Sequence, residues 1–255
     1  MTHHNKILEN SSQKAYKKSH VTIETLLDLL IEDRDIDIMD KNKIVKLPTI
    51  RRLPLYLYLL EKHFDQGRTT ISSNHLAKEM NVEPIVVRKD LTITDIVGKP
   101  RIGYDIEALI KAIRSFIYWD SSQEGILIGS GNLGSAILQY SGFEQMGFSI
   151  PVAFDMNDEL AGKQIGQTTV YSMEEMPHLI ERMGWKLAVL CVPAPAAQSL
   201  ANQLIELGIN AIWNFAPVRL QVPEHVVVQQ ENLIAGLTVL RVKQQKMESS
   251  PLEDQ

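Results

Sequence analysis

A glycine-rich run between two apolar segments is the part of this chain with the clearest chemical use. Gly129, Gly131 and Gly134 form a G-x-G-x-x-G pattern after Ile126-Leu127-Ile128 and before an apolar-periodic helix. The pattern predicts a strand, a tight turn and a helix whose first N–H groups bind a pyrophosphate. Asp155 ends a second apolar run about twenty residues further on, where a carboxylate can accept hydrogen bonds from a ribose. The sequence therefore predicts an NAD(H) site, and the whole spacing disfavours a strand–helix turn without a ligand.

Length and composition define the class of protein. The chain has 255 residues, of which 44% are hydrophobic and 22% charged, which predicts a globular protein of one large or two ordinary domains. It has no apolar run of membrane-spanning length and no signal-peptide pattern at its start, so we expect a cytoplasmic protein without a membrane partner. The single cysteine, Cys191, excludes an intramolecular disulfide, and the scattered histidines show no metal-ligand spacing.

The charge is distributed unevenly. Lys41 to Tyr104 contains twelve Lys/Arg and six Asp/Glu, a local charge of +6, whereas the remainder contains fourteen and twenty-five, about −11; the sum is the net charge of −5. A basic segment in an acidic chain is typical of binding to a polyanion, although an ordinary solvated surface also explains it.

The basic segment has the pattern of three helices and a hairpin. A helical apolar period runs from Leu53 to Phe64, Ser72 can cap a short second helix, and a third helix runs from Pro84 to Leu91. The glycine-bounded run 98–103 predicts a hairpin tip. The order predicts a winged helix-turn-helix, and a small helical dimerisation domain with a basic face is the alternative.

The second half alternates strand-like and helical patterns. This alternation predicts a Rossmann-type, doubly wound parallel sheet with helices on both faces. Apolar residues at Leu233, Leu237, Leu240 and Val242 predict a last amphipathic helix, which has nothing after it to pack on and so is expected on a partner subunit. An amphipathic helix over 21–35 is also predicted, without a readable role.

These motifs together resemble the family of redox-sensing transcriptional repressors called Rex, over approximately residues 46–240. The stretches that carry the resemblance are Arg51-Arg52-Leu53-Pro54-Leu55-Tyr56, Ser72-Ser73, Arg88-Lys89-Asp90-Leu91, Gly129 to Gly134, Val192-Pro193-Ala194, Ala197-Gln198, Gly208-Ile209, Asn214-Phe215-Ala216-Pro217 and Val222-Pro223. The resemblance implies a homodimeric repressor that binds palindromic double-stranded operator DNA and leaves it when NADH replaces NAD. It also implies a C-terminal helix swapped between protomers.

The resemblance assigns three groups of residues. The implied cofactor site consists of Gly129, Ser130, Gly131, Asn132, Leu133, Gly134, Asp155, Val192, Pro193, Ala194, Asn214, Phe215, Ala216 and Pro217. The implied switch consists of Tyr140 and Asn232. The implied DNA-binding residues are Arg52, Ser72, Ser73, Arg88, Lys89, Lys99 and Arg101. No catalytic or metal-binding residue is expected.

The predicted organisation follows from these assignments. Residues 1–45 form an extension of unknown role, 46–104 the winged-helix domain, 105–122 a connecting helix and linker, 123–230 the NAD(H)-binding domain, 231–245 a dimerisation helix and 246–255 a tail.

The chain departs from the family pattern at two places. Thr92 to Val97 replaces an aromatic-glycine stretch after the recognition helix, and its Asp95 disfavours DNA electrostatically. Asn232 and Leu233 stand where many relatives have Asp and Phe, so a switch that depends on that acid cannot operate here in its usual form. Asn232 can still hydrogen-bond Tyr140, so the departure does not exclude sensing.

Two other classes of protein remain as alternatives. An NAD-dependent oxidoreductase needs a proton-transferring group. Tyr58 and Lys62 form a Tyr-x-x-x-Lys pair, but it precedes the nucleotide fold, and His178 and His225 have no evident partner. A structural or dimerisation protein that uses NAD only for stability is the third possibility.

Overall fold

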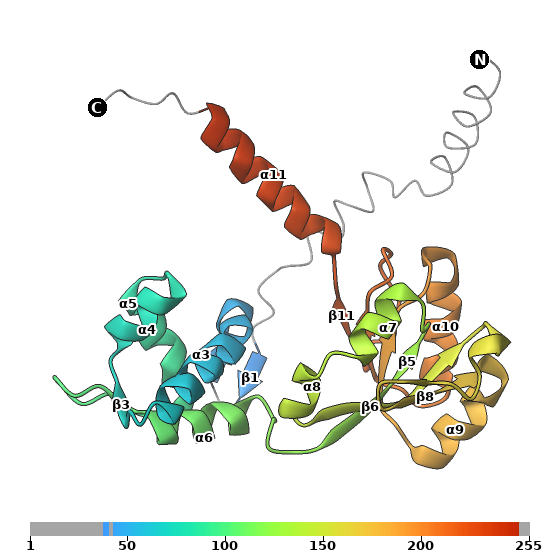
Figure 1. Cartoon of the computed structure of the whole chain (residues 1–255), viewed down its shortest axis with the longest axis horizontal. Coiled ribbons are helices and arrows are strands. Elements are labelled where there is room, and N and C mark those ends of the chain that lie inside the picture. Colours follow the sequence, from blue (N-terminus) through green and yellow to red (C-terminus); the bar gives the residue numbers. More distant parts are fainter. Residues whose placement is uncertain (1–37, 41–42, 250–255) are drawn as a thin grey trace. The chain divides into compact units, whose positions relative to one another are not determined.

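The computed structural model describes residues 38–40 and 43–249, which form two compact units (Figure 1). One unit extends to residue 123 and includes 141–149, and the other contains 124–140 and 150–249. The helix predicted over 21–35 lies outside the described residues. Within the described part of the chain, no helix combines the length and apolar character needed to cross a membrane.

The first unit is a winged helix-turn-helix. Its elements are β1 (Ile38–Asp40), β2 (Lys43–Val45), α3 (Leu47–Asp65), β3 (Thr70–Ile71), α4 (Ser73–Met80), α5 (Pro84–Leu91), the 3-10 turn η1 (Thr92–Thr94), β4 (Tyr104–Asp105), α6 (Ile106–Phe116) and the short α8 (Gly142–Gln145). Strands β3 and β4 pair antiparallel, and directly before β4 an antiparallel bridge between Lys99 and Gly103 closes a tight hairpin. This hairpin is the predicted wing.

Local sequence explains the two central helices. The Ser72 side chain accepts a hydrogen bond from the His75 N–H and so caps α4, as predicted. Asn81 ends α4 in the left-handed conformation with φ 53°, which asparagine tolerates better than most residues. Pro84 then begins α5, whose Val87 and Leu91 are fully buried. The third helix of the motif therefore presents its other face to solvent.

Helix α6 belongs to the core of the first unit. Its Ile106, Leu109 and Ile113 are completely buried in one cluster with Leu53 and Leu57 of α3. The sequence assigned this helix to a connection over 105–122. That prediction did not include the packing of the apolar stripe of α6 on α3.

A buried carboxylate fixes α5 to α3. Asp90 accepts a hydrogen bond at Oδ2 from Nε of Arg52 (2.6 Å) and from the hydroxyl of Tyr56 (2.9 Å). At Oδ1 it accepts from Nη2 of Arg52 and from the hydroxyl of Thr49, both at 2.8 Å. Burial, and next the negative charge of Asp90, raise the pKa of Tyr56, so its hydroxyl stays protonated and donates.

The second unit contains a seven-stranded sheet in the order β11-β10-β9-β5-β6-β8-β7. Its strands are β5 (Gln123–Ile128), β6 (Phe148–Asp155), β7 (Gln164–Ile165), β8 (Thr168–Ser172), β9 (Leu187–Leu190), β10 (Ala211–Asn214) and β11 (Val227–Gln230). The neighbouring strands of β11-β10-β9-β5 run parallel, as do β6 and β8, whereas β7 pairs antiparallel with β8 at one edge. The doubly wound sheet is confirmed, and the antiparallel edge strand was not predicted.

Helices cover the two faces of this sheet (Figure 1). Helices α9 (Met176–Met183) and α10 (Ala194–Glu206) share a core with Ile126 and Ile128 of β5. Helix α7 (Asn132–Leu138) lies on the opposite face, since a Cβ at Gly134 would contact the side chain of Leu127. The short 3-10 turns η2 (Asp158–Leu160) and η3 (Met173–Glu175) complete the unit.

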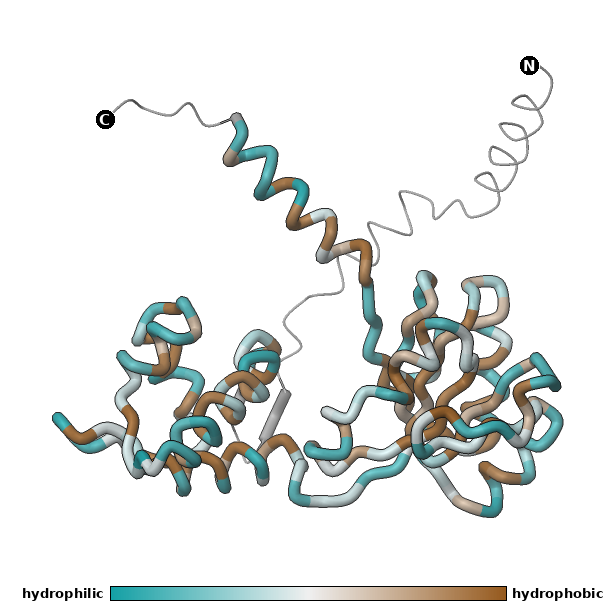
Figure 2. Tube along the Cα trace, viewed as in Figure 1, coloured by the Kyte–Doolittle hydropathy of each residue, from teal (hydrophilic) through white to brown (hydrophobic). Residues whose placement is uncertain are grey.

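The last helix, α11 (Leu233–Ser249), contains several apolar residues (Figure 2), and these are exposed. Leu233, Leu237 and Leu240 are 69%, 59% and 61% exposed, although their i, i+4, i+7 spacing puts them on one stripe. A helix of this kind is incomplete without another apolar surface.

We expect Asp90→Ala to destabilise the first unit by at least about 2 kcal/mol, because Arg52 and the buried Tyr56 hydroxyl lose their charged acceptor. Denaturant unfolding of the full chain, followed by circular dichroism, measures the loss. Asp65→Asn, at the exposed end of α3, is the matched control and should leave stability unchanged. We call the hydrogen bonds from Thr49, Arg52 and Tyr56 to Asp90 the Asp90 clamp. Equal stability of the two variants would show that this clamp does not stabilise the first unit.

Candidate dinucleotide site and nucleic-acid interface

The predicted cofactor segments meet at one edge of the sheet. Ile128, Leu190, Asn214 and Gln230 occupy the same level of four adjacent parallel strands. The loops that follow β5, β9 and β10 therefore leave the sheet side by side, at its carboxyl edge. Ligands of doubly wound folds bind at this edge.

The three glycines of the first loop have different structural roles. Gly129 has φ 92°, and a Cβ there would lie 2.5 Å from the carbonyl oxygen of Cys191. A Cβ at Gly134 would collide with the carbonyl oxygen of Gly129, so this residue allows α7 to pack on the strand. Gly131 is exposed and a Cβ there would contact nothing. Its lack of a side chain leaves room beside the first N–H groups of α7, which have no partner within the helix.

Asp155 holds the glycine loop from the end of β6. Its Oδ2 accepts hydrogen bonds from the N–H (2.7 Å) and hydroxyl (2.8 Å) of Ser130, and its Oδ1 accepts from the Asn157 N–H at 2.9 Å. A carboxylate can accept about four hydrogen bonds, so one more from a ribose hydroxyl is possible. Asp155 is thus both a support of the loop and a candidate ribose ligand.

Asn214 is fully buried and supports the loop that follows β10. Its Oδ1 accepts from the Ala216 N–H at 3.0 Å, and its Nδ2 donates to the oxygens of Val218 (2.9 Å) and of the Gln230 side chain (2.7 Å). The Gln230 amide returns hydrogen bonds to the carbonyl oxygens of Asn214 and Ala216. The side chain of Asn214 therefore positions Phe215, Ala216 and Pro217 by these bonds.

Sequence reasoning missed Gln230. A polar residue at the end of a strand is a weak signal, because such residues are usually solvated. Only the register that pairs Gln230 with Asn214 reveals its role.

The loop after β9 is short and stiff. Pro193 precedes α10 directly, and Pro193 itself is exposed at the edge. Burial raises the pKa of the neighbouring Cys191 thiol to about 12, so it remains protonated at neutral pH. This supports the interpretation of Cys191 as a small apolar residue.

The two predicted switch residues lie next to helices of the second unit. Tyr140 follows α7 and is 58% exposed. Asn232 precedes α11, and its Oδ1 accepts from the N–H groups of Ile234 and Ala235 at 3.1 Å. Asn232 is therefore a capping residue of α11. A hydrogen bond between Asn232 and Tyr140 stays a prediction.

The cations predicted to contact DNA lie in two places on the first unit. Arg88 and Lys89 are exposed on α5, and Lys99 and Arg101 are exposed at the tip of the wing. The Arg88 guanidinium donates to the Ser73 hydroxyl at 3.4 Å, whereas the Ser72 hydroxyl caps α4.

Arg52 differs from the other predicted DNA-binding residues. Both its Nε and its Nη2 are used on Asp90, and its side chain is only 29% exposed. The hydrogen bond to Asp90 raises the pKa of Arg52, which keeps it charged. Its role in the structure is to support α5, which carries Arg88 and Lys89.

Fold and site together define a class: a winged-helix DNA-binding unit joined to a dinucleotide-binding sheet. Comparisons with protein families agree with both halves. A family described as "Putative DNA-binding protein N-terminus" matches residues 45–92, and one described as "CoA binding domain" matches residues 120–218.

Whole-chain comparisons give the family. The chain is 42% identical to the redox-sensing transcriptional repressor Rex of Treponema denticola, over 80% of this chain and 97% of the relative. It is 35% identical to Rex of Bacteroides thetaiotaomicron, over 83% and 96%. The chain belongs to the Rex family of redox-sensing transcriptional repressors.

Solved structures of a Rex-family repressor called RSP are also similar. RSP in complex with β-NAD⁺ and operator DNA is 34% identical, with a TM-score of 0.74 over 81% of this chain and 95% of that chain. RSP in complex with β-NADH is 34% identical, with a TM-score of 0.72 over 81% and 97%.

Membership of a repressor family removes the oxidoreductase alternative. Tyr58 and Lys62 lie on α3 of the winged-helix unit, where Tyr58 is exposed and Nζ of Lys62 lies 3.6 Å from Oε2 of Glu79. His178 and His225 are exposed surface residues.

We expect NADH to bind more tightly than NADPH, because Asp155 would repel a 2′-phosphate. Calorimetric titration of both nucleotides measures this preference. Asp155→Asn retains an oxygen that accepts from Ser130 but removes the negative charge. The substitution should therefore reduce the ratio of the affinity for NADH to that for NADPH. Asp158→Asn, on the exposed turn η2, is the control. Equal affinities of the unmodified protein for NADH and NADPH would show that Asp155 does not face the ribose.

Proposed function

We propose that this protein is a transcriptional repressor that binds operator DNA as a homodimer and is released when NADH replaces NAD⁺. One observation carries the proposal: a single chain of the Rex family contains both a winged helix with exposed cationic side chains and a candidate dinucleotide site at the carboxyl edge of a parallel sheet. Because operator DNA and the NAD(H) pool of a bacterial cell are both cytoplasmic, we place its action there.

The two groups of cations suit different parts of a DNA duplex. Arg88 and Lys89 lie on the exposed face of α5, and an exposed helix of this motif enters the major groove. Arginine there can contact guanine edges. Lys99 and Arg101, at the tip of a hairpin, suit phosphates, which carry no sequence information.

A second copy of the chain is the natural occupant of the α11 stripe. On the sheet face that α7 covers in part, Val227 is 69% exposed, and Trp213 and Ala211 are partly exposed. Apolar residues are therefore open both on α11 and at the β10–β11 edge of the sheet. Exchange of α11 between two chains would cover both surfaces, and a twofold dimer fits a palindromic operator.

A sensor needs unequal affinity of the ligand for two states of the protein. NAD⁺ has a planar, positively charged nicotinamide ring, whereas NADH has a neutral, puckered one. The candidate groups around this ring are the loop of Pro193, the loop held by Asn214, and Tyr140. Asn232 is neutral, so here discrimination depends on shape and hydrogen bonding.

Titration of a palindromic operator with the full chain, with NAD⁺ and NADH added separately, tests the function. We expect tighter binding with NAD⁺ than with NADH. Arg88→Ala should reduce the free energy of operator binding by roughly 1–3 kcal/mol and relax sequence specificity. Lys99→Ala should weaken binding to all DNA sequences alike and reduce the slope of log affinity against log salt concentration by about one.

The outcomes of this titration separate the candidate functions. Unchanged affinity in the Arg88→Ala/Lys89→Ala variant would contradict the assignment of α5. NAD(H) binding without operator binding would favour the structural alternative.

Substitutions at Asn232 and Tyr140 test the switch. Asn232→Asp should widen the ratio of operator affinities measured with NAD⁺ and with NADH, because it restores a charge that responds to the ring. Tyr140→Phe should narrow the ratio and leave operator binding without cofactor largely intact. If neither variant alters the ratio, the signal follows another route, although the repressor function would stand.

A further inference from the structure

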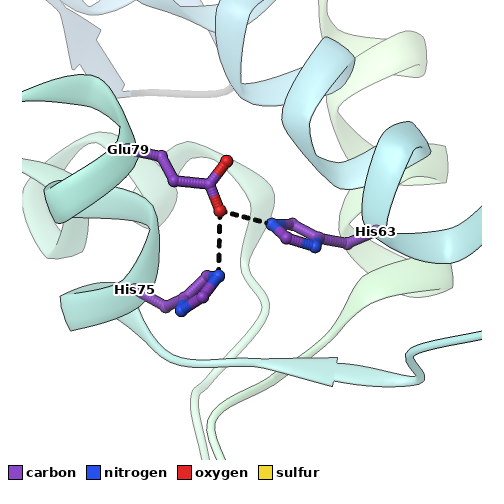
Figure 3. A group of neighbouring side chains, drawn as sticks. All are labelled: His63, His75 and Glu79. Carbon is purple, nitrogen blue, oxygen red and sulfur yellow. Dashed lines mark hydrogen bonds and ion pairs between the residues drawn. The ribbon is translucent and has the colours of Figure 1, made fainter. Parts of the chain in front are cut away.

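Two histidines and a glutamate converge between α3 and α4 of the winged-helix unit (Figure 3). The Nε2 atoms of His63 and His75 lie 2.6 and 2.8 Å from the same oxygen, Oε1 of Glu79. The three candidate ligand atoms all lie within 4.8 Å of one another. The sequence predicted no metal site because His63 is on a different helix from His75 and Glu79. The fold supplies the missing ligand.

The local structure explains the convergence. His75 and Glu79 are four residues apart on α4 and so share one face. His63, in the last turn of α3, reaches this face with a side chain that is only 5% exposed. The two imidazole rings are 5.0 Å apart and inclined by 63°, so their nitrogens point to one region without stacking.

We propose that His63, His75 and Glu79 bind a divalent transition-metal ion, with Zn²⁺ as the best match. Two imidazole nitrogens and one carboxylate oxygen are a ligand set that zinc uses in three-residue sites, where water completes the tetrahedron. Zinc ligands at tetrahedral angles lie about 3.3 Å apart. The Glu79 oxygen therefore has to retreat by less than about 1 Å from each nitrogen, which a side chain on a helix surface can do.

Neighbouring groups set the strength of the site. Nζ of Lys62 lies 3.6 Å from Oε2 of Glu79, and Nη1 of Arg68 lies 3.1 Å from Nε2 of His75. Both cations are on exposed side chains and must move aside for a metal. Although burial opposes it, the hydrogen bond from His63 lowers the pKa of Glu79, so the carboxylate is ionised and ready to coordinate.

His63 also limits the affinity. Its Nδ1 is buried and has no hydrogen-bond partner in the described part of the chain. A metal on Nε2 requires the proton on Nδ1, and metal-bound histidines normally donate that proton to an acceptor. Loss of such an acceptor typically costs about 10- to 100-fold in affinity, so this site should bind zinc more weakly than a closed structural site.

Zinc binding to the chelator-treated full chain, in competition with a chromogenic chelator, tests the proposal. We expect one Zn²⁺ per chain. Glu79→Gln and His75→Ala should each weaken binding at least about 100-fold, since they remove a ligand and not only its support. Both positions are on the surface side of the cluster, and thermal melting without metal verifies that the variants fold.

Two controls exclude other metal ligands. His178→Ala removes an exposed histidine on α9, and the pair His3→Ala/His4→Ala removes adjacent histidines near the start of the sequence. Both should bind zinc as the unmodified chain does. Loss of zinc binding in the His3/His4 variant would overturn the proposal. Zinc affinity in Glu79→Gln and His75→Ala equal to that of the unmodified chain would also overturn it.

A spectroscopic measurement needs no variant. Co²⁺ added to the unmodified chain should give the intense visible bands of tetrahedral coordination, and zinc should displace them. Absence of stoichiometric Zn²⁺ binding or of these bands would identify the cluster as a hydrogen-bonded His–Glu–His group only.

Discussion

Two amide side chains, the buried Asn214 and the partly buried Gln230, join the loop after β10 to the strand that leads into α11. Three consecutive residues then connect different parts of the second unit. The side chain of Gln230 donates a hydrogen bond to the loop. Glu231 accepts at Oε1 from the Trp213 indole (2.8 Å), and its backbone N–H donates to the backbone carbonyl oxygen of Asn214. Asn232 caps α11. A displacement of the loop therefore reaches the first turn of α11 through direct hydrogen bonds. Because a buried polar group that loses its partner is costly, we expect the loop after β10, strand β11 and the first turn of α11 to move as one body.

The winged-helix unit uses a charged version of the same principle. Asp90 has four hydrogen bonds from three side chains of α3, so α5 cannot rotate on α3 without exposing a buried carboxylate to apolar surroundings. Arg88 and Lys89 immediately precede Asp90 on α5. The clamp on one side of the helix therefore fixes the direction of the cations on the other side. The neutral pair in the second unit has no charge to desolvate, which suits a region that must respond to a ligand.

The fold was largely predictable from the sequence because its signals are local. The glycine spacing, the Ser72 cap and Pro84 each act through the backbone of their own few residues, and the structure places all three as expected. What the sequence did not reveal depends on contacts between distant segments. Helix α6 has the same apolar stripe whether it connects domains or completes a core. The antiparallel strand β7 has only two residues, too few for a periodic pattern.

The site was predictable in part for the same reason. The loops at the carboxyl edge follow from strand order, but the division of labour among their residues does not. The family resemblance assigned Asn214 to the cofactor and Arg52 to DNA, but in the structure both side chains form hydrogen bonds within the protein. Gln230, and the convergence of His63 with His75 and Glu79, depend on register and helix packing. Neither leaves a spacing that can be recognised in the chain.

The position of Asn232 shows why a single residue can alter both stability and sensing. Its oxygen accepts from the first N–H groups of α11, where the helix dipole favours a negative charge. An acid at this position would strengthen the cap in every state of the protein, by up to about 1 kcal/mol at an exposed site. That contribution cancels in the ratio of affinities with NAD⁺ and NADH, because it is common to both. Only an interaction that differs between the two cofactor states changes the ratio, so the ratio isolates sensing from capping.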